Sequence, residues 1–299
     1  MNPYYIGVVL VLISAASFGV MPIFAIYAYQ GQATVTTVLF LRFALATIMF
    51  FSYIAVKVKN LAITRSCLWS LILMGGVLYT LQSNLYFFAV KHIPASLVAL
   101  LFYAYPVFVA VLASVVDKER PTQNTLTAIL MALTGLTMVL GTSLAGLNVL
   151  GALLALGAAA VYSIYIVLGN RLVKDIPPVI TSAFVSLFAS FSLLLVGLMS
   201  RQLVFDFAGY AWWPILGIVV FSTVIAIFTF FRGLELLGST RAAILSMIEP
   251  LVTIVFSTVL FHDRLTALQW AGGLLVLTGA FLAVTNQKQP AHELGRLRG

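Results

Sequence analysis

Long apolar runs, separated by short polar gaps, make up most of this chain of 299 residues. A helix needs about 20 apolar residues to cross a bilayer core of about 30 Å. Ten segments of that length can be read from the sequence: residues 5–27, 35–56, 67–89, 95–116, 122–141, 148–169, 179–199, 211–232, 240–261 and 266–285. The pattern predicts an all-α membrane protein with ten transmembrane helices.

Composition strengthens this prediction. Hydrophobic residues make up 62% of the chain and charged residues 8%, with a mean hydropathy of +1.12, whereas soluble proteins have about 45–50% and about 25%. The net charge of +8 could suit nucleic acid, but the basic residues lie singly in the gaps and form no basic stripe. The chain has a single cysteine, Cys67, and its three histidines lie in predicted loops or the tail. Neither pattern predicts a metal centre. We expect no cofactor, no metal and no nucleic-acid partner, only membrane lipid and a small-molecule substrate.

The distribution of lysine and arginine predicts the orientation. If the N-terminus lies inside, twelve of these residues fall in the inner gaps and the tail, and only Lys91, Arg201 and Arg264 fall outside. Inner loops of membrane proteins carry the excess of positive charge. We therefore expect both termini in the cytoplasm of a bacterium, with the chain in its inner membrane. The first segment lacks a basic N-terminal region, so we interpret it as a mature helix and not as a signal peptide.

The sequence repeats itself at an offset of 144 residues. Sliding it by that distance without a gap superposes several turn and helix residues, among them Gly7 on Gly151, Pro106 on Pro250, Glu119-Arg120 on Asp263-Arg264, and Thr134-Gly135 on Thr278-Gly279. Five spans per copy, an odd number, place the second copy upside down in the membrane. We predict two inverted-topology five-helix repeats at 1–145 and 146–286 and a cytoplasmic tail at 287–299. Such repeats are common in secondary transporters.

The second copy resembles a known family. Glu249-Pro250-Leu251, the stretch from Phe261 to Thr266, Gly272-Gly273 and Thr278-Gly279 are similar to the EamA-type members of the drug/metabolite transporter superfamily. The chain length and the abundance of aromatic residues also resemble the aromatic amino-acid exporters of that superfamily. The resemblance implies an exporter. The Glu-Pro pair is not duplicated, because Tyr105 stands where the second copy has Glu249.

Two prolines lie near the middle of matching spans. Pro106 and Pro250 have no N–H, so the carbonyls of Phe102 and Ser246 lose their helical partners. Unpaired backbone at that depth is tolerated only where protein or a water-filled cavity satisfies it, and matched interrupted helices indicate a transport site. We expect both prolines to act as hinges or kinks, with a kink that only shapes packing as the alternative.

Polar residues in two spans predict where a substrate binds. Tyr79, Gln82, Ser83 and Tyr86 lie on one helical face of the third span, which should face a cavity because polar groups are costly in lipid. For any single residue, a hydrogen bond between helices is the alternative. We predict a central substrate-binding pocket lined by Tyr79, Gln82, Ser83, Tyr86, Phe102, Tyr162, Ser163 and Ser246.

Two charged residues lie within predicted spans. Glu249 is the acidic residue at mid-span, and it could carry a proton, bind a substrate ammonium or cap a carbonyl freed by Pro250. Arg42 lies about 10 Å into the second span, from the helical rise of about 1.5 Å per residue. We expect its side chain to snorkel to the interface; the alternative is that it faces the cavity and binds a substrate carboxylate.

These patterns favour a secondary transporter that exports small metabolites, amino acids including aromatic ones, by alternating access through a cavity between the repeats. The alternatives are a multidrug or cation exporter and a passive solute channel. The sequence contains no Walker-type loop, no H-E-x-x-H and no G-x-S-x-G, so we expect neither direct use of ATP nor enzyme activity. Glu249 leaves proton coupling open, although its place directly before Pro250 favours a facilitator.

Overall fold

A computed structural model describes residues 2–58, 63–118, 121–141, 148–261 and 266–285. The described part contains helices and no strand, and ten of its helical segments are long and apolar enough to span a membrane. The predicted number of spans is therefore confirmed. The predicted tail lies outside the described residues.

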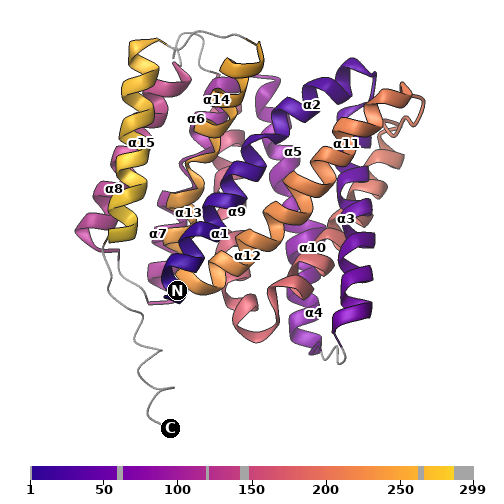
Figure 1. Cartoon of the computed structure of the whole chain (residues 1–299), viewed down its shortest axis with the longest axis horizontal. Coiled ribbons are helices and arrows are strands. Elements are labelled where there is room, and N and C mark those ends of the chain that lie inside the picture. The colour runs from indigo at the N-terminus through magenta and orange to yellow at the C-terminus, as the bar shows by residue number, and fades with distance from the viewer. Residues whose placement is uncertain (1, 59–62, 119–120, 142–147, 262–265, 286–299) are drawn as a thin grey trace.

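The first five spans run from Pro3 to Leu140 (Figure 1). They are formed by α1 (Pro3–Gly19) with α2 (Met21–Gln30); α3 (Val35–Lys57); α4 (Arg65–Ile72), the π-helix η1 (Leu73–Leu78) and α5 (Tyr79–Val90); α6 (Ala95–Phe102) with α7 (Tyr105–Val116); and α8 (Gln123–Leu140). The next five are formed by α9 (Val149–Asp175); α10 (Pro178–Met199); the 3-10 helix η2 (Gly209–Ala211), α11 (Trp212–Val219), the π-helix η3 (Val220–Ile225) and α12 (Ala226–Leu237); α13 (Ser239–Ser246) with α14 (Glu249–Phe261); and α15 (Ala267–Thr285).

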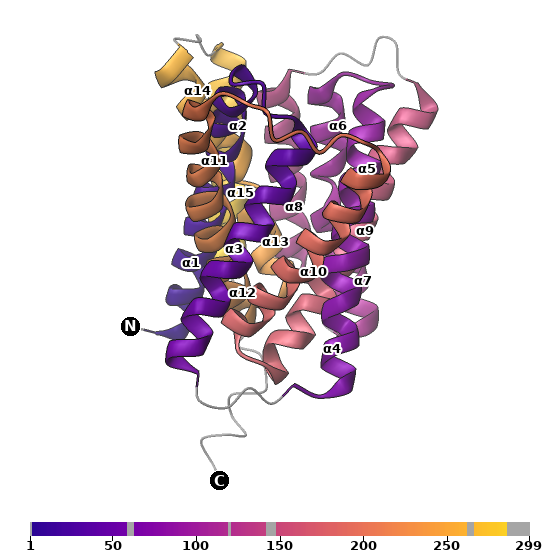
Figure 2. The same cartoon turned by 90° about the vertical axis from the view of Figure 1, so that its right-hand side faces the viewer.

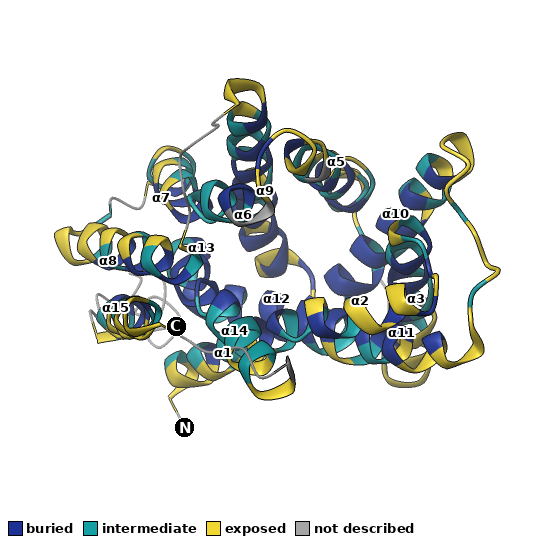
Figure 3. Cartoon of the chain, turned by 90° about the horizontal axis from the view of Figure 1, so that it is seen from above, coloured by how far each residue is buried: buried dark blue, intermediate teal, exposed yellow. Residues whose placement is uncertain are grey.

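Successive spans run in opposite directions between two ends of the molecule (Figures 1 and 2). We call the end where α1 begins and α15 ends the lower end, and the opposite one the upper end. Across the two halves, α1 packs along α12, α9 along α5, α3 along α10 and α8 along α15. Exchanging the halves leaves this set of pairs unchanged, as inverted repeats require. In the view from above, α8 and α15 lie side by side at one edge of the molecule (Figure 3).

Two helices extend beyond the predicted spans at the lower end. Because α9 continues to Asp175 and α12 to Leu237, Arg171 lies in a helix and not in a loop, and Arg232, the last residue of its predicted span, lies before the end of α12. Arg171 is paired with Asp117, directly after α7, at 3.0 Å, and Arg232 is paired with Glu235 one turn further along α12. The predicted lower ends of these two spans were wrong because the helices continue past the apolar run, where their charged side chains form ion pairs.

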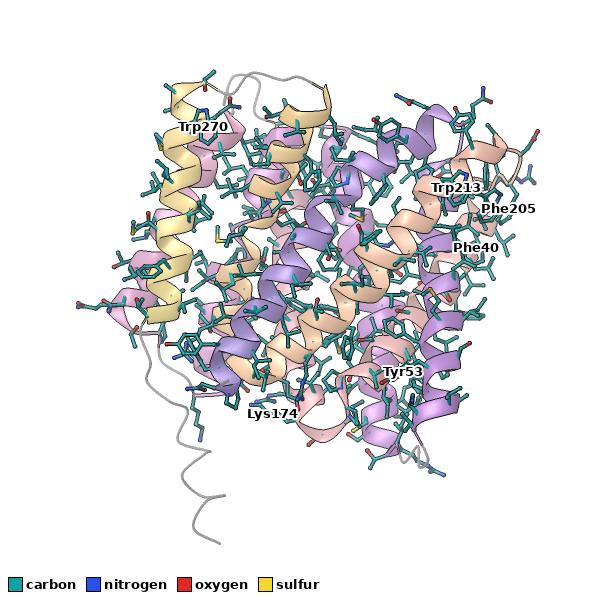
Figure 4. The ribbon with its side chains drawn as sticks, in the orientation of Figure 1. Phe40, Tyr53, Lys174, Phe205, Trp213 and Trp270 are labelled. Atoms are coloured by element: carbon teal, nitrogen blue, oxygen red, sulfur yellow. The ribbon has the colours of Figure 1, made fainter. Side chains whose placement is uncertain are left out.

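Exposed aromatic side chains mark both ends of the bundle. Trp213 and Trp270 are 78% and 62% exposed and lie near the upper end, opposite Lys174 at the lower end (Figure 4). Trp69, in α4, is 70% exposed toward the lower end. Tryptophan and tyrosine gather at the two interfaces of membrane proteins. With ten apolar spans, this distribution makes the chain an integral, multi-pass membrane protein.

Glycines bring α8 and α15 into close contact. A Cβ atom added at Gly272 would lie 2.5 Å from the carbonyl oxygen of Gly135, whereas one added at the neighbouring Gly273 would meet only Leu251, at 3.7 Å. We expect Gly272→Ala to destabilise the protein by about 1–3 kcal/mol, the usual cost of overpacking. Gly273→Ala, the matched control, should be neutral or slightly stabilising. Thermal unfolding of both variants in detergent measures the difference, and equal melting temperatures would contradict this packing.

Candidate functional site

Two matched helix breaks lie in the middle of the bundle. α6 ends at Phe102 and α7 begins at Tyr105, while α13 ends at Ser246 and α14 begins at Glu249. These positions superpose under the shift of 144 residues. Each break precedes a proline, Pro106 or Pro250, whose missing N–H cannot bond to the carbonyl four residues earlier. The backbone is therefore interrupted at the same place in both repeats.

Two π-helical segments occupy equivalent spans. η1 lies in the third span and η3 in the eighth, which is the third span of the second repeat. Single π-turns in α-helices often occur at functional sites. In η3, the Thr223 hydroxyl donates to the Ile218 carbonyl at 2.9 Å. The Ser222 carbonyl accepts from a side chain of another span, described below. The sequence carried no signal for either segment.

An aromatic cluster connects the breaks to the second repeat. We use that name for Tyr86, Phe102, Tyr103, Tyr105, Tyr162, Tyr165 and Phe231. The ring centroids of Phe102 and Tyr162 are 5.4 Å apart, and those of Tyr105 and Tyr162 are 5.0 Å apart. Tyr86 extends the cluster from Phe102, at 5.5 Å, and Tyr165 extends it from Tyr162, at 5.8 Å. The cluster is therefore a continuous row of rings shared by both halves.

Hydrogen bonds to backbone carbonyls fix residues around the breaks. Tyr105 donates to the Ala243 carbonyl of the other repeat at 3.2 Å. The Ser163 hydroxyl is buried and lies 3.0 Å from the Tyr105 carbonyl and 2.7 Å from the Ala159 carbonyl. The Ser246 hydroxyl donates to Ala242 at 2.9 Å. In this structure Ser163 connects α9 to the start of α7, whereas the Ser246 hydroxyl bonds within its own helix, α13.

Glu249 begins α14 next to the aromatic cluster and is partly exposed. The Tyr103 side chain lies beside its carboxyl, close enough to influence it. Tyr86, Tyr162 and the guanidinium of Arg42 lie within electrostatic range of it. Among the described residues, no lysine or arginine is within ion-pair distance of Glu249.

Arg42 does not snorkel. Its side chain is 2% exposed, and its Nε and Nη2 atoms donate to the Thr223 hydroxyl at 3.1 Å and to the Ser222 carbonyl at 2.9 Å. A third bond joins Nη1 to the Met21 sulfur at 2.8 Å, and the guanidinium stacks over Phe43 at 4.7 Å. The expectation was wrong because α3 packs against α11 and η3, where the interior offers polar partners.

A small internal cavity of about 30 Å³ lies beside Arg42. Its wall is formed by residues from both repeats, among them Arg42, Phe43, Tyr79, Tyr162, Tyr165 and Phe230. We call it the Arg42 cavity. Each water needs about 10–15 Å³ of such volume, so it has room for about two waters.

The structure brings together some of the predicted pocket residues. Tyr79 and Tyr162 line the Arg42 cavity. Tyr86 and Phe102 lie at the other end of the aromatic cluster. Gln82 and Ser83 are on the same helix as Tyr79 but do not line this cavity, and the Ser83 hydroxyl lies 3.5 Å from the Gln82 side-chain oxygen.

The sequence reasoning missed three tyrosines of the cluster as site residues. Tyr165 lies one turn after Tyr162, on the same helical face, so spacing could have found it. Tyr105 aligns with Glu249 under the shift, and Tyr103 aligns with Met247. The repeat could therefore have indicated both Tyr103 and Tyr105, because they lie at the first helix break, which aligns with the second.

Apolar packing joins the two halves at both ends of the bundle. One continuous core includes Ile54, Leu71, Val173 and Leu234, from the lower parts of four spans. At the upper end the buried residues instead form two separate clusters, one on α2, α3 and α11 and the other on α5, α6 and α9. The two halves are therefore in apolar contact both below and above the site.

Comparison with known proteins places this architecture in a family. The model of the EamA-like transporter family matches the chain twice, over residues 5–141 and 149–285. The chain belongs to the EamA-like transporter family. The two matches correspond to the two five-helix repeats. EamA proteins are transporters and not enzymes, so this chain is a membrane transporter.

The relatives of this EamA protein agree with that assignment. The uncharacterized transporter YcbK of Bacillus subtilis is 26% identical over 302 residues, covering 97% of this chain and 95% of its own. The probable amino-acid metabolite efflux pump of Escherichia coli is 28% identical over 204 residues, 64% of this chain and 68% of its own. A solved crystal structure superposes with a TM-score of 0.79 at 18% identity, covering 98% of this chain and 99% of the other. That likeness shows the fold.

Proposed function

We propose that this EamA protein is a secondary transporter that exports small metabolites, amino acids including aromatic ones, by alternating access. The observation that carries the proposal is the pair of matched helix breaks beside the aromatic cluster shared by both repeats. Interrupted helices at mid-membrane depth are where transporters of this architecture bind their substrates.

Alternating access follows from the symmetry of the repeats. In the conformation described, one large core reaches the lower end, and two smaller clusters join the halves at the upper end. Because the halves are inverted copies, exchanging their conformations produces a state in which the packing is reversed. The breaks before Pro106 and Pro250 provide the points at which the fourth and ninth spans can bend.

The chemistry of the site favours amino acids over cationic drugs. Aromatic rings offer faces and edges against which a flat apolar side chain can pack. The positive charge of Arg42, buried without an acidic partner among the described residues, repels a cation. The relative from Escherichia coli is named for amino-acid metabolite efflux. The small volume of the Arg42 cavity, about 30 Å³, also argues against an open pore.

Counterflow in proteoliposomes tests this function. Purified protein should exchange radiolabelled phenylalanine, tyrosine or tryptophan against the same unlabelled amino acid, with saturation at high concentration. Ethidium and tetraphenylphosphonium serve as cationic comparisons. Exchange of these cations alone would support a multidrug exporter, and rapid flux without saturation would support a channel.

The charge distribution predicts the orientation of the transporter. Because lysine and arginine gather in the lower gaps and the tail, we expect both termini in the cytoplasm and the 142–147 connection outside. Single cysteines at positions 145 and 290, after Cys67 is replaced, can be labelled in intact cells with an impermeant reagent. Position 145 should react and position 290 should not. The reverse result would refute this orientation.

A further inference from the structure

The strongest unexplained feature of the site is the buried charge of Arg42. Its side chain is 2% exposed in the middle of an apolar bundle. Within the described ranges, the two ion pairs are Arg171 with Asp117 and Arg232 with Glu235, so no carboxylate is within 4.0 Å of Arg42. Burying an ion without a paired counter-charge is costly even after the protein relaxes.

The guanidinium also has hydrogen-bonding capacity that the protein does not use fully. An arginine side chain has five N–H groups, and three bonds are present, to Thr223, Met21 and Ser222. One of these acceptors is a thioether sulfur, which is a weak one. All three acceptors are uncharged, so they orient the guanidinium without neutralising it, and Glu249 lies within electrostatic range but forms no ion pair with it.

The Arg42 cavity lies where a counter-charge would be bound. It has about 30 Å³, and Tyr79, Tyr162 and Tyr165 border it together with Arg42. Since that volume holds about two waters, it suits a carboxylate head group and not a whole amino acid. Tyr162 belongs both to this cavity and to the aromatic cluster, whose rings are 5.0 to 5.8 Å from its own. A solute with its head group at Arg42 would therefore place its side chain against the cluster.

We propose that Arg42 binds the carboxylate of the transported solute. A planar guanidinium matches a carboxylate with two parallel hydrogen bonds, which lysine cannot reproduce. The inference rests on the proposed function and extends it, because it defines the substrates as solutes that carry a carboxylate. It also gives η3 a role. The Ser222 carbonyl and Thr223 hydroxyl hold the guanidinium in the orientation that faces the cavity.

A pair of solutes that differ only in the carboxylate tests the proposal. Tyrosine and tyramine are compared in counterflow for the wild type, Arg42→Gln and Arg42→Lys. The wild type should prefer tyrosine, and Arg42→Gln should lower tyrosine exchange at least about 30-fold, the lower bound for removing one partner of a buried charge pair. Its tyramine exchange should not fall. Arg42→Lys should retain part of the preference because it keeps the charge but loses the two-pronged geometry.

A purely structural role for Arg42 predicts a different result. If Arg42 only connects α3 to η3, Arg42→Gln should lower tyrosine and tyramine exchange equally, and that outcome would overturn the proposal. Unchanged preference for tyrosine in Arg42→Gln would overturn it as well. Arg171→Gln is the matched control, since it removes a half-exposed arginine that is paired with Asp117 and does not line the Arg42 cavity. Its tyrosine preference should equal that of the wild type.

Ligand binding separates this inference from the proposed function. In detergent, 4-hydroxyphenylpropionate should raise the melting temperature of the wild type and of Arg42→Lys but not that of Arg42→Gln, whereas equimolar chloride should have little effect. An equal shift with chloride would mean a site for small anions in general and would overturn the carboxylate assignment. If the carboxylate stabilises the wild type only through Arg42 but no amino acid is exchanged, the proposed function fails and the carboxylate site stands. If amino acids are exchanged equally well with and without Arg42, the carboxylate site fails and the proposed function stands.

Discussion

Replacing Tyr162 with alanine should lower amino-acid exchange at least about 30-fold, while the variant still folds and reaches the membrane. Its ring is 5.0 Å from that of Tyr105 and 5.4 Å from that of Phe102, and it also lines the Arg42 cavity. Losing a central aromatic contact costs about 2 kcal/mol or more at a binding site, and each 1.4 kcal/mol corresponds to a tenfold change. Because one side of the ring borders a cavity, the loss of packing should be smaller than for a side chain surrounded by protein.

Matched variants separate a role in transport from a role in folding. Tyr53→Ala removes a tyrosine that is 55% exposed on the outer face of α3 (Figure 4), and it should transport like the wild type. Phe231→Ala removes a fully buried ring and should lower the melting temperature more than Tyr162→Ala does. Gln82→Ala should weaken transport less than Tyr162→Ala, because Gln82 does not line the Arg42 cavity. Full transport by both Tyr162→Ala and Gln82→Ala at wild-type expression would remove these residues from the proposed site.

The features that the sequence predicted well depend on local chemistry. The length of each apolar run decides that there are ten spans, and the missing N–H of Pro106 and Pro250 accounts for the helix breaks. The repeat was visible in the sequence because matched positions have the same structural role in both copies. Thr122 caps α8 by accepting from the Thr125 N–H, and Thr266, its partner under the shift, caps α15 by accepting from the Gln269 N–H.

The features that the sequence did not predict depend on contacts between distant segments. The Arg42 partner Ser222 is 180 residues away along the chain, so no local pattern distinguishes a buried arginine from a snorkelling one. The two π-helices likewise need no special residue to form, because packing against neighbouring spans decides them. The ends of α9 and α12 were placed too early because the prediction stopped at the first charged residue, whereas Arg171 and Arg232 are held in helices by Asp117 and Glu235.

Glu249→Gln should abolish accumulation driven by a pH gradient while it preserves counterflow. The sequence favoured a facilitator because Glu249 precedes Pro250 and could cap the carbonyl that this proline frees. Among the described residues, no hydrogen bond joins this carboxyl to a backbone carbonyl, and Tyr103 of the other repeat lies beside it. It is therefore not committed to a fixed backbone partner. Carboxylates at membrane depth are typical of proton paths, and this one lies at the first residue of α14, directly after a break.

Three measurements on proteoliposomes decide whether Glu249 carries the proton. Wild-type protein should accumulate labelled amino acid against its gradient when a pH gradient is imposed. Glu249→Gln should not, because glutamine keeps the size and a polar side chain but cannot titrate. Glu235→Gln, at the lower end of α12 beside Arg232, is the matched control and should accumulate normally. If the wild type ignores the pH gradient and Glu249→Gln exchanges solute as well as the wild type does, the protein is a facilitator. In that case Glu249 would have only a structural role at the break, because no step of transport would require the carboxyl to gain or lose a proton.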